Sequence, residues 1–200
     1  MLRVGIYGGA FAPIHKGHVE AAKAFMQQMW LDVLFVIPTG LSPHKQMDNS
    51  ASAEDRMEMC RLAFRDIEGV IVSDMEIRRG GKSYSVDTVR DMSGDDQRLF
   101  MLCGTDMMLT LDEWDQAEEI FKLCYPVYIR REEDRSLDSK IIEKNTEYFE
   151  KFGKYVIKLD APVINISSTE LRSKIKRGED VSEYIDSEVL KYIEEKGLYR

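Results

Sequence analysis

The sequence predicts an α/β protein with a Rossmann-like, doubly wound, mostly parallel sheet and helices on both faces. Three features of the chain lead to this prediction. Short apolar runs alternate with longer segments of helical periodicity. The apolar runs are continuous, which is typical of strands covered on both faces. The strand-helix-strand order indicates parallel crossovers, and ligands of such sheets bind at the carboxyl ends of the strands.

The first crossover is predicted near the start of the chain. Residues 2–7 form a short apolar strand that ends at Gly8-Gly9. A helix is expected from about residue 17 to residue 30, because apolar residues recur there at helical spacing. These residues are Val19, Ala22, Met26 and Met29. Residues 33–37 form the next strand, an apolar run that a proline stops.

The same alternation continues through the rest of the chain. The expected elements are a helix over about 53–65, a strand over 70–73, a helix from about 86, a strand over 98–103, helical segments over about 106–122, a strand over 125–129, a helix over about 137–152, a strand over 155–159, and helices over about 168–177 and 186–196. A chain of 200 residues can bury one good core. We therefore expect a single domain over 1–200, in which about 168–200 form a small helical C-terminal part.

The charge and hydropathy of the chain exclude two kinds of partner. The formal net charge is -8, and a nucleic-acid surface needs clustered Lys and Arg to displace counterions. No apolar run approaches the roughly 20 residues that span a bilayer. We expect neither a nucleic-acid nor a membrane partner, while a small anionic ligand fits if basic groups are concentrated locally.

The cysteines indicate a reducing compartment. Cys60, Cys103 and Cys124 are an odd number, lie in hydrophobic segments and lack Cys-x-x-Cys spacing, so we expect buried free thiols. The first residues lead directly into a strand without a signal-peptide pattern. The expected location is cytoplasmic.

The segment after the first strand carries the strongest chemical signal. It is Gly8-Gly9-Ala10-Phe11-Ala12-Pro13-Ile14-His15-Lys16-Gly17-His18. Glycines at the strand end let backbone N–H groups approach a phosphate, and the helix beginning near Gly17 adds its positive dipole end. His15 and His18 can both face that phosphate and donate hydrogen bonds to oxygens that become more negative during phosphoryl transfer. This pattern predicts a nucleotide-phosphate site.

Paired histidines have two other interpretations. They could ligate a metal, but no carboxylate or thiol lies at obvious ligand spacing nearby. They could simply be surface residues, yet the chain has only three histidines. The third, His44, lies in Pro43-His44-Lys45 just beyond the second predicted strand. All three then lie at carboxyl ends of neighbouring strands, from which Lys45 could reach the same phosphates.

A second charged segment, residues 130–135, could form a basic ligand site. Its arginines flank Glu132, Glu133 and Asp134. The interleaved acids favour a solvated loop.

The pattern Gly-Gly-x-Phe-x-Pro-x-His-x-Gly-His resembles the signature of the nucleotidyltransferase superfamily, whose His-x-Gly-His pair contacts ATP phosphates. Residues 166–172, Ile-Ser-Ser-Thr-Glu-Leu-Arg, are similar to the family pattern that closes over the triphosphate. Ser168 or Thr169 is expected to cap the following helix, with Arg172 one turn along and directed at the anion. The resemblance implies ATP-binding roles for Gly8, Gly9, Ala10, Phe11, His15, Gly17, His18, Gly104, Asp106, Ile166, Ser168, Thr169 and Arg172.

Within the superfamily the chain most resembles the nicotinate-nucleotide adenylyltransferase family, from residue 2 to residue 199. The matching segments are residues 37–45, Ser83-Tyr84-Ser85-Val86-Asp87-Thr88, Gly104-Thr105-Asp106, and Leu111 with Trp114. The resemblance implies that Trp114 stacks on the pyridine ring and that backbone at Tyr84-Ser85 binds the nicotinate carboxylate, which suits a helix start. A core position is the alternative for Trp114. The implied substrate-binding residues are Lys45, Ser83, Tyr84, Ser85, Asp106 and Trp114.

Four positions depart from the family pattern. Ala10 replaces a hydroxyl residue, Ala12 replaces Asp or Asn, Ser85 replaces Thr, and Ser42-Pro43 replaces Pro-Pro. None removes a charged group that contacts phosphate. The change at position 12 raises the question of how the loop after the first strand is braced.

The resemblance implies adenylyl transfer from ATP to nicotinate mononucleotide, giving deamido-NAD and pyrophosphate in NAD biosynthesis. His15, His18, Lys45 and Arg172 would neutralise charge, and Mg²⁺ would accompany the ATP phosphates without protein side-chain ligands. The rivals are an adenylyltransferase for nicotinamide mononucleotide or another acceptor such as phosphopantetheine, and a non-catalytic nucleotide-binding protein. A homo-oligomer is compatible with the sequence.

Overall fold

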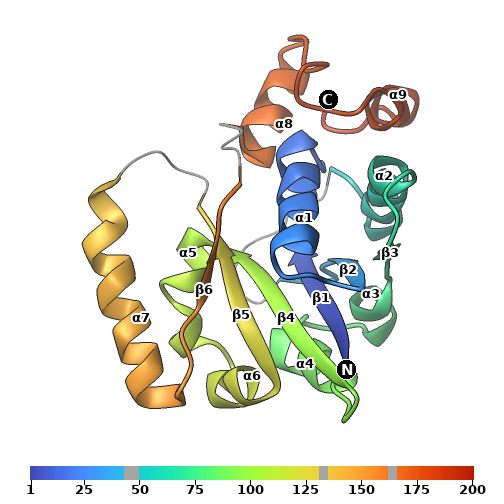
Figure 1. Cartoon of the computed structure of the whole chain (residues 1–200). Coiled ribbons are helices and arrows are strands. Elements are labelled where there is room, and N and C mark those ends of the chain that lie inside the picture. The colour runs from blue at the N-terminus through green and yellow to red at the C-terminus, as the bar shows by residue number, and fades with distance from the viewer. Residues whose placement is uncertain (43–49, 131–134, 162–165) are drawn as a thin grey trace.

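A six-stranded parallel sheet forms the centre of the computed structural model, which describes residues 1–42, 50–130, 135–161 and 166–200 (Figure 1). The strands are β1 (Leu2–Gly9), β2 (Val33–Pro38), β3 (Val70–Val72), β4 (Gln97–Gly104), β5 (Cys124–Ile129) and β6 (Ile157–Leu159). Their order in the sheet is β3-β2-β1-β4-β5-β6, and every pairing is parallel. The chain winds outward from β1 and then crosses back to β4, so the strand order reverses between these two central strands. This topology is the predicted doubly wound one.

Helices follow the strands along the whole chain. They are α1 (Lys16–Gln28), α2 (Ala53–Phe64), α3 (Met75–Arg79), α4 (Ser85–Asp91), α5 (Thr105–Met108), α6 (Ala117–Leu123), α7 (Asp138–Phe152), α8 (Ser168–Lys176) and α9 (Ser187–Lys196), with 3-10 turns η1 (Leu111–Glu113) and η2 (Arg135–Leu137). The predicted helices at about 53–65, 137–152, 168–177 and 186–196 correspond to α2, α7, α8 and α9.

The sheet is buried on both faces, because alternate residues of each strand point in opposite directions. Val4 and Ile6 of β1 pack with Val89 of α4 in one apolar cluster. Tyr7 packs with Phe25 of α1 in the other. Residues of α2, α8 and α9 belong to the cluster of α1, and residues of α6 and α7 belong to that of α4. The continuous apolar runs of the sequence are explained by this two-sided burial.

The structure departs from the prediction at three elements. Helix α3 was not predicted, because five residues are too few to show a period. The helical segment at 106–122 is divided into α5, η1 and α6. The last strand spans Ile157–Leu159 rather than 155–159.

The buried face of α1 also differs from the predicted one. Its buried residues are His18, Ala21, Ala22 and Phe25. Val19, Met26 and Met29 only flank this face and are partly buried. Since His18 is polar, hydropathy alone did not include it, and the apparent apolar stripe was rotated toward its neighbours. His18 therefore belongs to the buried face of α1.

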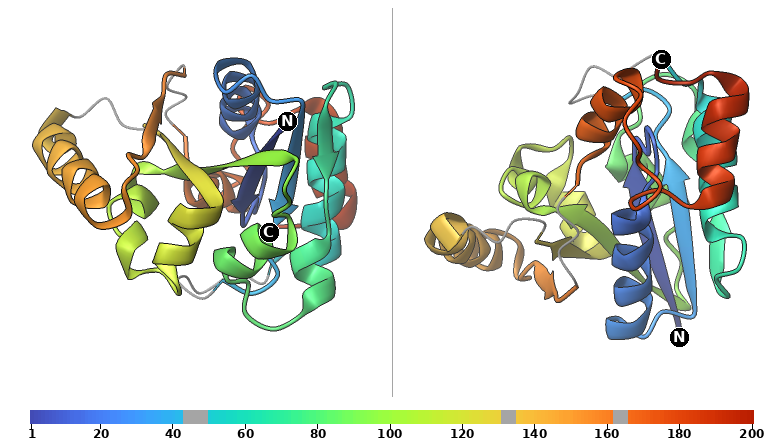
Figure 2. Two further views of the ribbon diagram at one scale, coloured as in Figure 1. Left: turned by 60° about the horizontal axis from the view of Figure 1, so that its bottom comes forward. Right: turned by 90° about the horizontal axis from the view of Figure 1, so that it is seen from above.

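The C-terminal helices pack onto the rest of the chain. Figure 2 shows α9 beside α2, and Leu171, Val189 and Ile193 share one apolar cluster with α1. The Lys16 backbone N–H donates to the Tyr184 carbonyl over 2.8 Å. These contacts hold α8 close to the start of α1.

Two further expectations concern the chain as a whole. Cys60, Cys103 and Cys124 are free and buried, as predicted. Burial raises the pKa of the Cys124 thiol to about 12, despite the nearby charge of Lys154. Within the described ranges, no helix is both long enough and apolar enough to cross a membrane.

Candidate active site

A cavity of about 420 Å³ opens at the carboxyl ends of β1 and β4, where the strand order reverses. Doubly wound sheets bind ligands at such a switch point. The predicted residues that line the cavity are Gly8, Gly9, Ala10, Phe11, His18, Ser83, Ser85, Gly104, Asp106, Trp114, Ser168, Thr169 and Arg172. Segments far apart in the sequence therefore share one cavity.

The loop after β1 has the tight backbone that its glycines predicted. A Cβ added at Gly9 would lie 3.0 Å from the Phe11 ring, so a side chain there would displace that ring. Phe11 itself has a left-handed φ of 47° and is 2% exposed. Its ring meets the Tyr7 ring edge-on, with 5.4 Å between the centroids. Burial of the Phe11 ring holds the loop backbone against the end of β1.

The two histidines of the motif lie together at the start of α1. Their ring centroids are 3.8 Å apart, and the side chains are 7% and 8% exposed for His15 and His18. The His15 backbone N–H donates to Nδ1 of His18 over 3.3 Å. An Nδ1 that accepts a hydrogen bond leaves the proton of a neutral imidazole on Nε2. His18 can therefore donate from Nε2 into the cavity that it lines.

Helix α8 closes the loop from the other side. The Ser168 Oγ donates to the Pro13 carbonyl over 2.9 Å, and Arg172 Nη1 donates to the Ala12 carbonyl over 2.8 Å. Backbone carbonyls at 12 and 13 thus brace the loop where a carboxylate or amide side chain is missing. Ser167, and not Ser168 or Thr169 as expected, caps α8 by accepting from the Glu170 N–H. The Ser168 hydroxyl does not cap the helix, because it donates to the Pro13 carbonyl in the loop.

The opposite side of the cavity is built from short elements. Ser85 is the first residue of α4, and Tyr84 precedes it as the N-cap. Asp106 lies in the first turn of α5, and Trp114 ends the turn η1. Trp114 is partly buried and packs against the cluster of α4, but it also lines the cavity. Trp114 therefore contacts the apolar cluster and also borders the cavity.

Some predicted residues do not line the cavity. His15, Gly17, Tyr84 and Ile166 lie beside it and are absent from its described walls. His15 supports His18 through ring contact, Gly17 lies inside α1, and Ile166 packs on the cluster of α1. Lys45, together with His44, falls outside the described residues.

Glu76 and Thr88 line the cavity although the sequence did not single them out. The Thr88 hydroxyl donates to Glu76 Oε1 over 2.9 Å and accepts from Arg79 Nη1 at 3.2 Å. Burial raises the pKa of the Glu76 carboxyl, although hydrogen bonds from Thr88 and Ser83 and the charge of Arg79 oppose the shift. Thr88 belongs to the quoted 83–88 segment, whereas Glu76 lies in a helix too short to show a pattern.

The Ser83 hydroxyl connects this cluster to the loop after β2. It accepts from the Gly40 backbone N–H over 3.0 Å. A Cβ at Gly40 would lie 3.1 Å from the Glu76 carbonyl and 3.2 Å from Ser83 Oγ. A glycine is therefore suited to this close approach.

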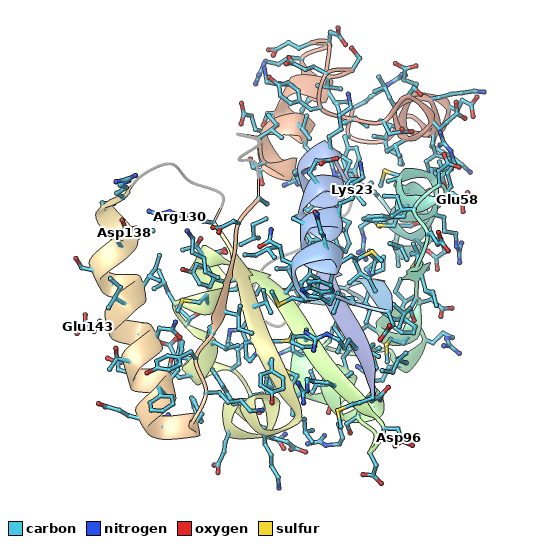
Figure 3. All side chains as sticks on the ribbon, in the orientation of Figure 1. Lys23, Glu58, Asp96, Arg130, Asp138 and Glu143 are labelled. Carbon is cyan, nitrogen blue, oxygen red and sulfur yellow. The ribbon has the colours of Figure 1, made fainter. Side chains whose placement is uncertain are left out.

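Two other candidate sites can be assessed. Arg130 at the end of β5 forms an ion pair with Asp138 at the start of α7, and Figure 3 shows both at one end of that helix. Residues 131–134 fall outside the described residues. Across the part of the chain that the structure describes, no three His, Cys, Asp or Glu side chains gather as metal ligands.

Comparison with known proteins gives a consistent family. Residues 6–174 match the family described as cytidylyltransferase-like. A probable nicotinate-nucleotide adenylyltransferase of Clostridium botulinum is 34% identical over 201 residues, covering 100% of this chain and 99% of that protein. One of Fusobacterium nucleatum is 33% identical over 196 residues, covering 96% and 97%.

Solved structures share the fold. Plasmodium falciparum nicotinic acid mononucleotide adenylyltransferase complexed with NaAD superimposes with a TM-score of 0.78 at 20% identity, covering 100% of this chain and 98% of that one. The same protein complexed with APC gives a TM-score of 0.77 at 19% identity, with the same coverage. Both comparisons extend over the full described fold, the C-terminal helices included.

Proposed function

The chain belongs to the cytidylyltransferase-like family and, within it, to the nicotinate-nucleotide adenylyltransferases, and we propose that it transfers the adenylyl group of ATP to nicotinate mononucleotide. The products are deamido-NAD and pyrophosphate, which places the reaction in NAD biosynthesis. One observation carries this proposal: a single cavity joins the glycine loop and α8 to Ser85 and Trp114. Two nucleotides can therefore meet in it.

We call the region of residues 8–18 and 166–172 the phosphate end of the cavity. Its described donors are His18 and Arg172, supported by His15 and by backbone N–H groups of the glycine loop. Imidazole and guanidinium groups bind phosphate oxygens, and Arg forms bidentate pairs with them. The phosphate end is suited to the triphosphate of ATP. Lys45 is proposed to join it from the loop after β2, on the family resemblance.

We call the region of residues 83–88, Glu76, Asp106 and Trp114 the acceptor end. The indole of Trp114 offers a flat apolar surface for a pyridine ring. Backbone N–H groups at Ser85 are proposed to bind the nicotinate carboxylate, and Asp106 a ribose hydroxyl, as the family resemblance implies. Nicotinate nucleotide would lie here with its 5'-phosphate turned toward the ATP.

The reaction needs no nucleophilic side chain. A 5'-phosphate oxygen of nicotinate mononucleotide attacks the α-phosphorus of ATP in line, a new P–O bond forms, and the bond to the bridging oxygen breaks as pyrophosphate leaves. Catalysis comes from holding two polyanions together and from stabilising the charge that develops on the phosphate oxygens. We assign that role to His18 Nε2 and to the Arg172 guanidinium, which both belong to cavity-lining residues.

Nucleotidyltransferases generally use a divalent cation together with ATP. We propose that this cation is Mg²⁺. It prefers oxygen ligands and keeps several waters, so phosphate oxygens of ATP would hold it. The described donors at the phosphate end, imidazole and guanidinium, bind anions instead. When bound, the ion neutralises phosphate charge in the transition state.

The proposed setting is the cytoplasm, which fits three buried free thiols. The proposed partners are two small molecules, ATP and nicotinate mononucleotide. A homo-oligomer is a further proposal, testable by light scattering of the purified protein.

The test is incubation with ATP, Mg²⁺ and one acceptor at a time, with pyrophosphate release and the dinucleotide product as readouts. We expect fast release with nicotinate mononucleotide and much slower release with nicotinamide mononucleotide or phosphopantetheine. Preference for another acceptor would replace the proposed substrate. Silence with every acceptor, from protein that still binds ATP, would indicate a nucleotide sensor.

A further inference from the structure

Arg56 is a buried cation directly behind the glycine loop. It lies in α2, is 2% exposed, and its Nη1 donates to the Ala10 carbonyl over 2.9 Å. Its Nε–H is buried without an acceptor among the described residues. Within residues 1–42, 50–130, 135–161 and 166–200, no carboxylate forms an ion pair with it. Burial lowers the pKa of Arg56, although Cys60, Tyr199 and Glu54 favour its charge.

Such an arginine is not explained by fold stability. Removing a guanidinium from water costs several kcal/mol unless an anion and hydrogen bonds compensate for it. Replacement of buried charges by apolar residues of similar volume is often neutral or stabilising. The described contacts of Arg56 satisfy one of its five N–H donors. A function outside the core packing is therefore indicated.

The peptide that Arg56 holds has a defined orientation. The Ala10–Phe11 bond is trans, so its carbonyl and its N–H point in opposite directions. Because the Ala10 carbonyl is directed at Arg56, the Phe11 N–H is directed away from α2. Ala10 and Phe11 both line the cavity. The Phe11 N–H is therefore the group of this peptide that is available to a ligand in the cavity.

We propose that Arg56 is a positioning residue for the triphosphate: it fixes the Ala10–Phe11 peptide so that the Phe11 N–H donates to phosphate, and its buried charge raises the positive potential there. This inference rests on the proposed function for the identity of the phosphate compound. It assigns a role to a residue outside both family motifs. Arg56 thus holds the backbone at Ala10, a position where the family pattern has a hydroxyl residue.

The test compares Arg56→Met with Arg61→Met, a matched control on the same helix. Arg61 is exposed and pairs with Glu58 on the surface. Affinity is measured by calorimetry for ATP with Mg²⁺ and, separately, for nicotinate mononucleotide, and the melting temperature of the ligand-free protein is recorded. We expect Arg56→Met to raise the Kd for ATP about tenfold, the equivalent of about 1.4 kcal/mol. The Kd for nicotinate mononucleotide and the melting temperature should match those of Arg61→Met.

Two results would overturn the proposal. One is an unchanged Kd for ATP in Arg56→Met. The other is an equal loss of affinity for both nucleotides together with a lower melting temperature, which would indicate a general structural role. If Arg56→Met does not fold, the Kd values for ATP and for nicotinate mononucleotide are measured on Arg56→Lys. The lysine ammonium keeps the charge but lacks the planar, forked guanidinium. A failure of the proposed function gives a different result from a failure of this proposal. If the wild-type protein binds ATP but transfers to no acceptor, the affinities of Arg56→Met and Arg61→Met for ATP can still be compared.

Discussion

The two ends of the cavity differ in how the chain builds them. The phosphate end consists of two contiguous segments, residues 8–18 and 166–172, joined by hydrogen bonds from Ser168 and Arg172 to loop carbonyls. The acceptor end is assembled from α3, α4, α5 and η1, each seven residues or fewer. The proposed phosphate contacts thus come from two segments that contact each other, whereas the proposed acceptor contacts come from several short elements.

This difference indicates a division of labour. Changes at the phosphate end should affect turnover with any acceptor, because charge develops there. Changes at the acceptor end should affect the apparent affinity for nicotinate mononucleotide and leave ATP binding unchanged. The first two substitutions below test the two sides of that division, and the third tests the buried charge at the acceptor end.

The largest effect is expected for His18→Ala. Loss of a donor to developing negative charge typically costs on the order of 100-fold in kcat. The ring lines the cavity and belongs to neither apolar cluster, so the fold should persist, as circular dichroism would show. Near-normal turnover by this variant would remove His18 from the phosphate end.

A smaller effect is expected for Trp114→Ala. Loss of the stacking surface should raise the KM for nicotinate mononucleotide about fivefold, since aromatic stacking contributes roughly 1 kcal/mol beyond area burial. The KM for ATP should stay unchanged. The matched control is Trp30→Ala, because Trp30 is 78% exposed at the end of α1. A parallel rise in the KM for ATP would contradict the separation of the two ends.

The smallest effect is expected for Glu76→Gln and concerns stability. Burial raises the pKa of Glu76 above its ordinary value of 4.5, so ionisation is less favourable in the folded protein than in the unfolded chain. The charge therefore destabilises the fold increasingly as pH rises from about 4.5 through the raised pKa. The glutamine variant carries no charge at this position. Its melting temperature relative to wild type should therefore increase from acid to neutral pH.

The control for this measurement is Glu58→Gln, an exposed carboxylate on α2. Its melting temperature should follow wild type across the same pH range. If the difference in melting temperature between Glu76→Gln and wild type does not depend on pH, ionisation of Glu76 does not destabilise the fold.

The sequence predicted the two ends unequally, for physical reasons. The doubly wound fold followed from continuous apolar runs, and the loop after β1 followed from one compact pattern of glycines and histidines. Glu76 could not be found, because α3 is too short for periodicity. The buried side of α1 was misplaced because it contains His18. The cap of α8 was assigned to Ser168 or Thr169, but the Ser168 hydroxyl contacts Pro13, a long-range contact that no local pattern contains.

The most direct test of the divided cavity is a crystal structure of the protein with a non-hydrolysable ATP analogue, Mg²⁺ and nicotinate mononucleotide. The account predicts phosphate oxygens about 3 Å from His18 Nε2 and the Phe11 N–H, and the pyridine ring stacked on Trp114 with its carboxylate at Ser85. A structure with the two nucleotides exchanged, or with the pyridine away from Trp114, would contradict it.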